Sequence, residues 1–241
     1  MAIAIIPGIL IILYVYTKDR VEKEPITLIV KLLIFGAITT ILAGYAEAYS
    51  SMLFPQYPVG SLQYSLINSF CLAAFWEELL KFLALKIGSW RHPSFNYRFD
   101  GIVYGVSTAV GFALLENVMY VAQYGFQTAV VRAFTAVPLH AFCGVFMGIF
   151  YAYAKKASIL GQGGAKFACN LLALIVPMII HGIYDTLAFL RADWAFIGLM
   201  IFVVFLYIIA ISTIRKNSAE DYKAGFYPQA RTIEYDTTLT E

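Results

Sequence analysis

Long apolar stretches separated by short polar connections make up most of the chain. Seven stretches approach or reach the roughly 20 helical residues that cross the hydrocarbon core of a bilayer. They cover residues 2–16, 26–49, 62–87, 99–123, 131–154, 167–190 and 194–214. None alternates apolar and polar residues as a half-buried strand does, and a segment in lipid must satisfy its backbone hydrogen bonds internally. The pattern therefore predicts an all-α, polytopic transmembrane helix bundle of about seven spans.

The composition agrees with a membrane protein. Of the 241 residues, 61% are hydrophobic and 13% are charged, and the mean hydropathy is +0.74. Soluble domains are about half apolar and about a quarter charged. We expect residues 1–215 to form one membrane domain and residues 216–241, which are polar, to form a loosely ordered cytoplasmic tail. No basic patch with interleaved aromatic residues is present, so a nucleic-acid partner is not expected.

Lysine and arginine predict the orientation, because they concentrate in cytoplasmic connections. With the amino terminus outside, 13 of the 17 basic residues fall on the cytoplasmic side. Only Arg132 and Arg191 fall outside, and Lys31 and Lys81 fall within spans. We therefore expect the amino terminus outside and the carboxyl terminus in the cytoplasm.

Small residues recur at a spacing of four in two of the predicted spans. Gly101 and Gly105 do so in the fourth, and Gly144 and Gly148 in the fifth. Such faces let helix backbones approach closely in lipid. We expect packing faces at these positions.

Ionisable residues lie deep in four of the predicted spans. Each costs at least a few kcal/mol in a bilayer and is therefore a functional hypothesis by default. They are Glu77, Glu78 and Lys81 in the third stretch, Glu116 in the fourth, His140 in the fifth, and His181 and Asp185 in the sixth. A structural salt-bridge cluster is the alternative, but acids and histidines on four spans favour an active site. Glu47, near one end of the second stretch, and His92, in a connection, are expected to be solvated.

Helical spacing brings several of these residues together. Glu77 and Glu78 precede Lys81 by four and three residues, so Lys81 can pair with either carboxylate. Adjacent helical residues point about 100° apart, so one glutamate can face a site while the other braces it. His181 and Asp185 are four residues apart, so Asp185 can accept a hydrogen bond from the imidazole and fix its tautomer.

Three motifs in these spans resemble those of the PrsW family of membrane-embedded proteases. The family motifs are Glu-Glu-x-x-Lys, Phe-x-x-x-Glu and His-x-x-x-Asp. They stand here, in order, as Glu77-Glu78-Leu79-Leu80-Lys81, Phe112-Ala113-Leu114-Leu115-Glu116 and His181-Gly182-Ile183-Tyr184-Asp185. The resemblance covers about residues 10–190, and it extends to Lys18-Asp19-Arg20, Glu24-Pro25 and Asp100-Gly101-Ile102-Val103-Tyr104-Gly105.

The resemblance implies a specific activity. It implies site-one cleavage of an anti-sigma factor, a single-pass membrane protein, on the extracytoplasmic side of the plasma membrane of a Gram-positive bacterium. Cleavage would begin the release of the sigma factor under envelope stress. The family is also similar to the CAAX prenyl proteases, which share paired glutamates and buried histidines.

Two mechanisms are open for peptide hydrolysis, which needs an activated water and a stabilised oxyanion. In the first, a zinc ion (Zn²⁺) does both, as in other catalytic sites with two imidazoles and one carboxylate. Its ligands would be Glu116, His140 and His181. Glu77 would then be the general base, Glu78 would brace the site or add a ligand, and Asp185 would orient one imidazole. In the second, no metal is bound, Glu77 activates water directly and the histidines stabilise the tetrahedral intermediate.

A proton- or ion-coupled transporter is the alternative from a different functional class, because buried Glu, His and Asp also form proton relays. Transporters commonly show paired repeats and interrupted helices, and neither is visible in this sequence. We therefore predict a membrane endopeptidase.

Overall fold

The chain folds into a bundle of helices in this computed structural model, which describes residues 2–221 and 226. The helices are α1 (Ala2–Lys18), α2 (Ile26–Ser51), α3 (Leu62–Leu66), α4 (Phe75–Ser89), α5 (Arg98–Tyr124), α6 (Phe126–Phe134), α7 (Ala136–Ile159), α8 (Gly163–Phe189) and α9 (Asp193–Glu220), with a π-helical stretch η1 (Ile67–Ala74) between α3 and α4. Each of the seven predicted apolar stretches falls on these helical segments, so the predicted all-α polytopic bundle is confirmed.

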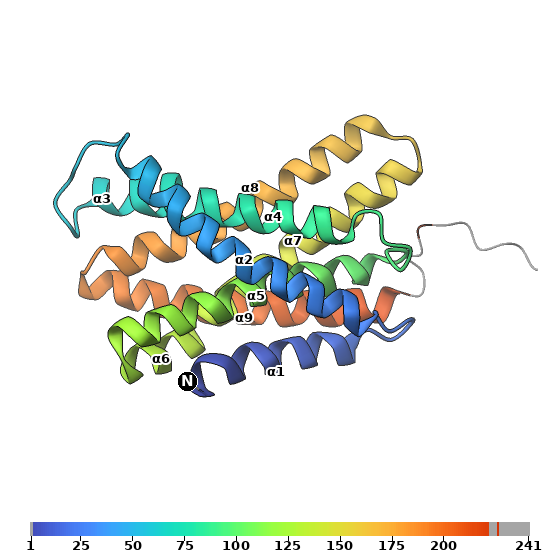
Figure 1. Cartoon of the computed structure of the whole chain (residues 1–241), viewed down its shortest axis with the longest axis horizontal. Coiled ribbons are helices and arrows are strands. Elements are labelled where there is room, and N and C mark those ends of the chain that lie inside the picture. The colour runs from blue at the N-terminus through green and yellow to red at the C-terminus, as the bar shows by residue number, and fades with distance from the viewer. Residues whose placement is uncertain (1, 222–225, 227–241) are drawn as a thin grey trace, which may run out of the picture.

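Five helical segments of the described chain are long and apolar enough to cross a membrane. They are α2, α5, α6 together with α7, α8 and α9, whereas α1 is apolar but shorter. Successive segments run in opposite directions (Figure 1). The 52–61 loop, α3 and the turn between α8 and α9 therefore gather at one end, which we call the α3 end.

The fifth predicted stretch differs from the prediction because a separate helix, α6, precedes α7. Gly125 adopts a φ of 84°, a region that favours glycine, and turns the chain directly after α5. Thr135 then interrupts the helix with φ −121° and ψ −73°. Pro138 lies in the first turn of α7, where a missing N–H leaves no hydrogen bond unmade.

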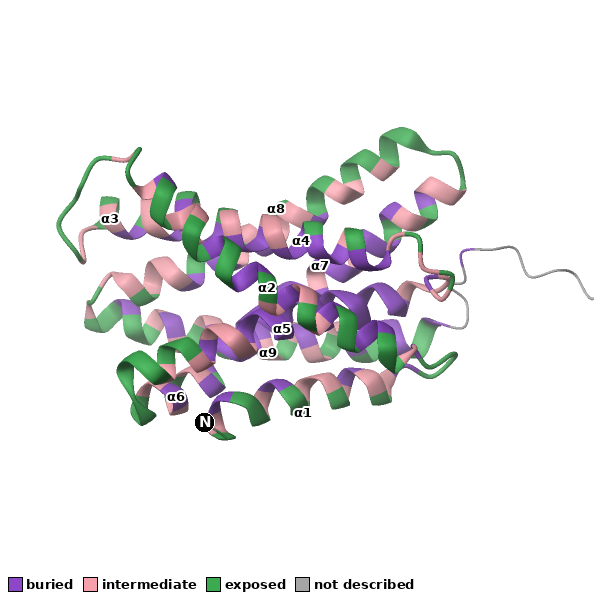
Figure 2. Cartoon of the chain, in the orientation of Figure 1, coloured by how far each residue is buried: buried purple, intermediate pink, exposed green. Residues whose placement is uncertain are grey.

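Helix α5 is the central helix of the bundle. Every residue from Phe99 to Ala113 is buried, as expected of a helix surrounded by others, and Figure 2 shows buried positions gathered on it. Its backbone touches that of α7, because a Cβ at Gly105 would lie 2.3 Å from the carbonyl oxygen of Gly144. A Cβ at Gly148 would likewise lie 2.1 Å from the carbonyl oxygen of Gly101. The glycines at a spacing of four are therefore packing positions, as predicted.

The end opposite α3 is closed by buried carboxylates on the chain connections. Asp19 and Glu24, between α1 and α2, are 1% and 2% exposed, and the Tyr104 hydroxyl donates to Glu24. Burial raises the pKa of Asp19 to about 6 and that of Glu24 to about 7. Asp221, directly after α9, accepts a hydrogen bond of 2.9 Å from the main-chain N–H of Phe99. These contacts join the connection between α1 and α2, and the residue after α9, to the first part of α5, at the end of the bundle opposite α3.

The predicted tail, residues 216–241, lies largely outside the described residues. Its first part is not loosely ordered, because α9 continues to Glu220. Phe226 is buried against Phe95, and its N–H donates to the carbonyl oxygen of Asn96.

Candidate active site

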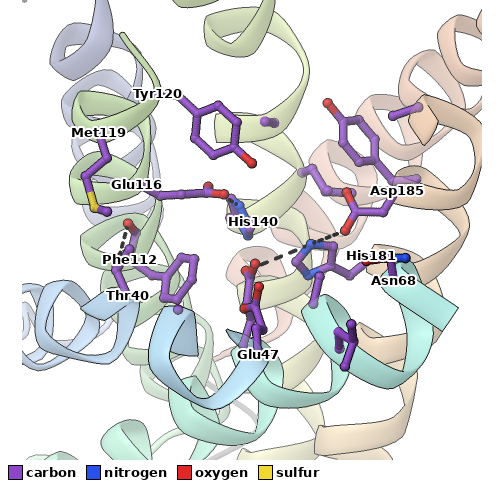
Figure 3. Close-up of a pocket in the computed structure, with 18 of the residues that line it drawn as sticks. Thr40, Glu47, Asn68, Phe112, Glu116, Met119, Tyr120, His140, His181 and Asp185 are labelled. Atoms are coloured by element: carbon purple, nitrogen blue, oxygen red, sulfur yellow. Dashed lines mark hydrogen bonds and ion pairs between the residues drawn. The ribbon is translucent and has the colours of Figure 1, made fainter. Parts of the chain in front are cut away.

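A cavity of about 560 Å³ lies among α2, η1, α4, α5, α6, α7 and α8. It extends to the α3 end, because Ser51 and Phe189, the last residues of α2 and α8, are part of its wall. Its charged and imidazole-bearing lining residues are Glu47, Glu77, Glu116, Arg132, His140, His181 and Asp185. The four spans predicted to carry the site thus meet at one cavity (Figure 3).

Local backbone structure places the paired glutamates at this cavity. The π-helical stretch η1 ends at Ala74, and both glutamates lie in the first turn of α4 that follows it. Such wide helical turns occur frequently at functional sites. Glu77 lines the cavity and is 6% exposed, whereas Glu78 is 0% exposed and is not part of the wall. Of the two adjacent glutamates, Glu77 therefore faces the cavity and Glu78 lies behind it.

Lys81, in the third predicted span, contacts side chains of both the third and the fifth predicted spans. Its ammonium lies 3.2 Å from Oε2 of Glu77 and 2.8 Å from Oε1 of Glu78, so both predicted pairs are present. It also lies 3.0 Å from Nδ1 of His140. An ammonium can only donate, so Nδ1 accepts and Nε2 carries the hydrogen of the neutral ring. That Nε2 lies 2.9 Å from Oε2 of Glu116, to which it donates.

His181 is held between two carboxylates. Its Nδ1 lies 2.8 Å from Oε1 of Glu78, and its Nε2 lies 3.2 Å from Oδ2 of Asp185. The contact between His181 and Asp185 is the one that their spacing predicts. Nε2 is also 3.9 Å from Oε2 of Glu77, at the edge of the cavity. The ring orientation is thus set from both sides.

Arg132 belongs to the site, although the sequence placed it in an outer connection. Its guanidinium donates to Glu116 at 2.6 Å and to the side-chain oxygen of Asn117 at 3.1 Å, and it lies 3.8 Å from the centre of the Tyr120 ring. Asn117 in turn donates to the carbonyl oxygen of Ala4 in α1. A carboxylate within a span needs a cationic partner, and this was the available signal in the sequence. Nothing in the spacing of the residues identified that partner as Arg132.

We expected Glu47 to lie in solvent near the end of its span, but it lines the cavity. It is half-buried on α2 and points into the cavity, as Figure 3 shows. A charge near the end of a span looks solvated from the sequence alone, and only the packing of α2 beside η1 and α5 turns it inward. His92 lies in the connection between α4 and α5, as expected, and is half-buried there, away from the cavity.

Four buried side chains bring possible metal ligands together. One ligand atom from each of Glu77, Glu78, His140 and His181 lies within 4.8 Å of the others. Two imidazoles and carboxylate oxygens suit zinc. Glu47, Glu77, Glu116 and Asp185 line the cavity and Glu78 lies behind it, so the carboxylates outnumber the basic side chains that contact them in the described chain, Lys81, Arg132 and His181. This excess of negative charge favours a bound cation. The donor chemistry therefore fits a divalent metal.

The residues expected to act together are thus in contact, with one change in arrangement. Glu116, expected as a zinc ligand, is not among the four clustered donors of the described chain. Its Oε2 contacts Arg132 and His140 instead.

Comparisons with known proteins agree with this site. Residues 24–211 match the model of the PrsW family intramembrane metalloproteases. The chain is 32% identical to Protease PrsW of Bacillus subtilis (strain 168) over 212 residues, which is 88% of this chain and 92% of that protein. It is 31% identical to Protease PrsW of Geobacillus kaustophilus over 79% of this chain and 80% of that protein, and 28% identical to Protease PrsW of Clostridioides difficile over 93% of each. No solved structure matches the chain. A family match over most of the chain, with its three motifs meeting in one buried cavity, shows that the chain belongs to the PrsW family and is an intramembrane protease of the bacterial cell membrane.

Proposed function

We propose that this protease cleaves a single-pass membrane protein, an anti-sigma factor, on the extracytoplasmic side of the membrane. The observation that carries the proposal is the convergence of two buried imidazoles and two carboxylates at a cavity that reaches the α3 end. The connections at the opposite end carry most of the basic residues, so we assign the α3 end to the outside. The anti-sigma factor is the substrate class that the PrsW resemblance implies.

In the mechanism that we propose, Glu77 is the general base. It faces the cavity, so its carboxylate can take a proton from the attacking water and deliver it to the nitrogen of the leaving group. Lys81 holds Glu77 in place from 3.2 Å, and Glu78 braces Lys81 and His181 from behind. Because one oxygen of Glu78 contacts both Lys81 and His181, removing this carboxylate should disturb the positions of both side chains.

Zinc is the metal that we propose for this site. His140, His181 and Glu78 would hold it, while Glu116 and Asp185 orient the two imidazoles through hydrogen bonds. The chemistry that zinc supplies when bound is polarisation of the scissile carbonyl and a lower pKa for bound water. The metal-free mechanism has one observation in its favour, since the Lys81 ammonium already contacts Glu77, Glu78 and His140.

The metal content of the purified protein separates these mechanisms. Plasma mass spectrometry should find about one zinc per chain in the wild type and far less in His140→Ala and His181→Ala, because a catalytic zinc site needs its protein ligands. Glu116→Gln should keep most of the metal if Glu116 orients His140, and should lose it if Glu116 is a ligand. Absence of metal from protein purified without a chelator would contradict the zinc proposal and favour hydrolysis by Glu77 alone.

The side of cleavage tests the proposed substrate class. The protein is reconstituted in liposomes with the anti-sigma factors of its host, and new amino termini are mapped by mass spectrometry. We expect one cut close to the membrane on the extracytoplasmic side, absent with Glu77→Gln. A cut in the cytoplasmic part would show that the proposed orientation is wrong, and intact anti-sigma factors would exclude this substrate class.

A further inference from the structure

Helices α2 and α5 are in backbone contact along the half of α2 that lies away from the α3 end. A Cβ at Gly36 would lie 1.9 Å from the carbonyl oxygen of Thr108, and one at Gly111 would lie 2.1 Å from that of Leu33. No side chain fits between backbones this close. The two helices are therefore fixed to each other along this half.

Towards the α3 end, Thr40 is the last residue of α2 that makes a side-chain hydrogen bond to α5 in the described chain. Its hydroxyl donates to the carbonyl oxygen of Phe112 at 3.1 Å. One turn further along α2, a Cβ at Gly44 would have no atom of the described chain within 4 Å beyond those of its own helical turn. Figure 1 shows α2 running away from α5 towards the α3 end. The helices thus form a wedge that is closed at Gly36 and open at Gly44.

The open part of the wedge is continuous with the catalytic cavity. Gly44, Glu47 and Ala48 line the cavity from α2, and Met119 and Tyr120 line it from α5. The same residues reach the surface of the bundle, since Gly44 and Ala48 are exposed and Met119 and Tyr120 are 52% and 38% exposed. In Figure 3, Glu47 and Tyr120 lie on opposite sides of the cavity. The site therefore has a side opening.

The neighbouring helices leave this opening uncovered. In the described chain, α2 packs mainly on α5, α4 and η1, whereas α6 packs on α1, α5 and α7. The residues that flank the opening on α2, Tyr45 and Tyr49, are 75% and 74% exposed. Exposed tyrosines of this kind are typical of the boundary between lipid and water. The wedge therefore faces the bilayer in the half of the bundle nearest the α3 end.

We propose that this wedge, between Gly44 and Ala48 on α2 and Met119 and Tyr120 on α5, is the lateral entrance through which a membrane-anchored substrate reaches Glu77. The inference rests on the proposed function, because its occupant is the substrate polypeptide. That occupant is the juxtamembrane segment of the substrate in an extended form, since a helical peptide bond is already hydrogen-bonded within its own helix. Glycine at position 44 lets this chain pass close to the α2 backbone.

A second cavity extends the path beyond the active site. It has a volume of about 230 Å³ and shares Ser51, Asn68 and Leu72 with the catalytic cavity. The 52–61 loop, Tyr64 and Ile67 form its other walls. A chain that enters from lipid at Gly44 can therefore pass Glu77 and continue under this loop towards the α3 end, where the substrate ectodomain lies.

A bulky residue at the entrance tests the path. We expect Gly44→Trp to lower cleavage of the membrane-anchored anti-sigma factor at least tenfold. It should slow cleavage of a short soluble peptide spanning the same bond much less than cleavage of the anchored substrate, because the peptide reaches Glu77 from the α3 end. Ile41→Trp is the matched control, since Ile41 is 51% exposed on α2 and does not line the cavity. If Gly44→Trp cleaved the anchored substrate at the wild-type rate, or slowed cleavage of both substrates equally, the proposed entrance would be wrong.

A labelling experiment gives a result even if the anti-sigma factor is not a substrate. In a background without Cys71, Cys143 and Cys169, we expect a water-soluble maleimide added from outside to label Gly44→Cys at least tenfold faster than Ile41→Cys. If the wild type cleaves neither substrate, the proposed function fails while this labelling still reports on the entrance. Equal, slow labelling of both cysteines would show that no open wedge exists at Gly44.

Discussion

Replacing Glu77 with glutamine should reduce the rate of peptide cleavage by about 10²–10⁴-fold, the usual contribution of a general base, and leave the bundle folded. Glutamine keeps the shape of the side chain, and its carbonyl oxygen can still accept from Lys81, which lies 3.2 Å from the carboxylate. It cannot take a proton from water. The measurement is kcat for the purified protein in liposomes, with the thermal unfolding temperature as the test of folding.

Glu78→Gln is the informative comparison, because the two glutamates are adjacent in sequence but differently placed. Glu78 accepts from both Lys81 and His181 through one oxygen and does not line the cavity. The neutral amide of a glutamine cannot replace the charge-assisted hydrogen bonds that the Glu78 carboxylate accepts. Glu78→Gln should therefore lower the unfolding temperature as well as the activity. If Glu77→Gln stayed active and Glu78→Gln were inactive but fully stable, the assignment of the base would have to be reversed.

Lys81→Met should destabilise the fold by about 3–5 kcal/mol, the usual effect of breaking a buried charge pair from one side. The Lys81 side chain is fully buried, and its ammonium contacts Glu77, Glu78 and His140. Without it, two buried carboxylates lose their shared cation. The measurement is equilibrium unfolding in detergent, read by circular dichroism.

Lys31→Met is the matched control, because Lys31 also lies in a predicted span but is exposed and, among the described residues, donates a hydrogen bond only to the carbonyl oxygen of Gly88. It should change stability little. Adding Glu78→Gln to Lys81→Met should recover part of the loss, since one unpaired charge is removed with its partner. An unchanged unfolding midpoint for Lys81→Met would mean that the carboxylates do not need the ammonium, as would be the case if they shared a proton.

Contacts within one helix followed from sequence spacing. Lys81 pairs with both glutamates and Asp185 holds His181 because residues three and four apart share a helix face, whatever the rest of the fold does. The spans themselves could be predicted for a similar reason. Lipid requires a continuous apolar helix of a certain length, so hydropathy alone locates it.

Contacts between helices could not be predicted in this way. Glu47, Arg132 and the choice between Glu77 and Glu78 depend on how neighbouring helices tilt, turn and approach. Gly36 and Gly44 show the difference: both are glycines on α2, yet one touches a backbone and the other faces an opening. The sequence by itself determined the helices, their polar residues and the contacts within each helix, because these depend on local periodicity and on lipid as the solvent. Only the tertiary structure decided which side chains share the cavity and where it opens, because those depend on packing between segments far apart in the chain.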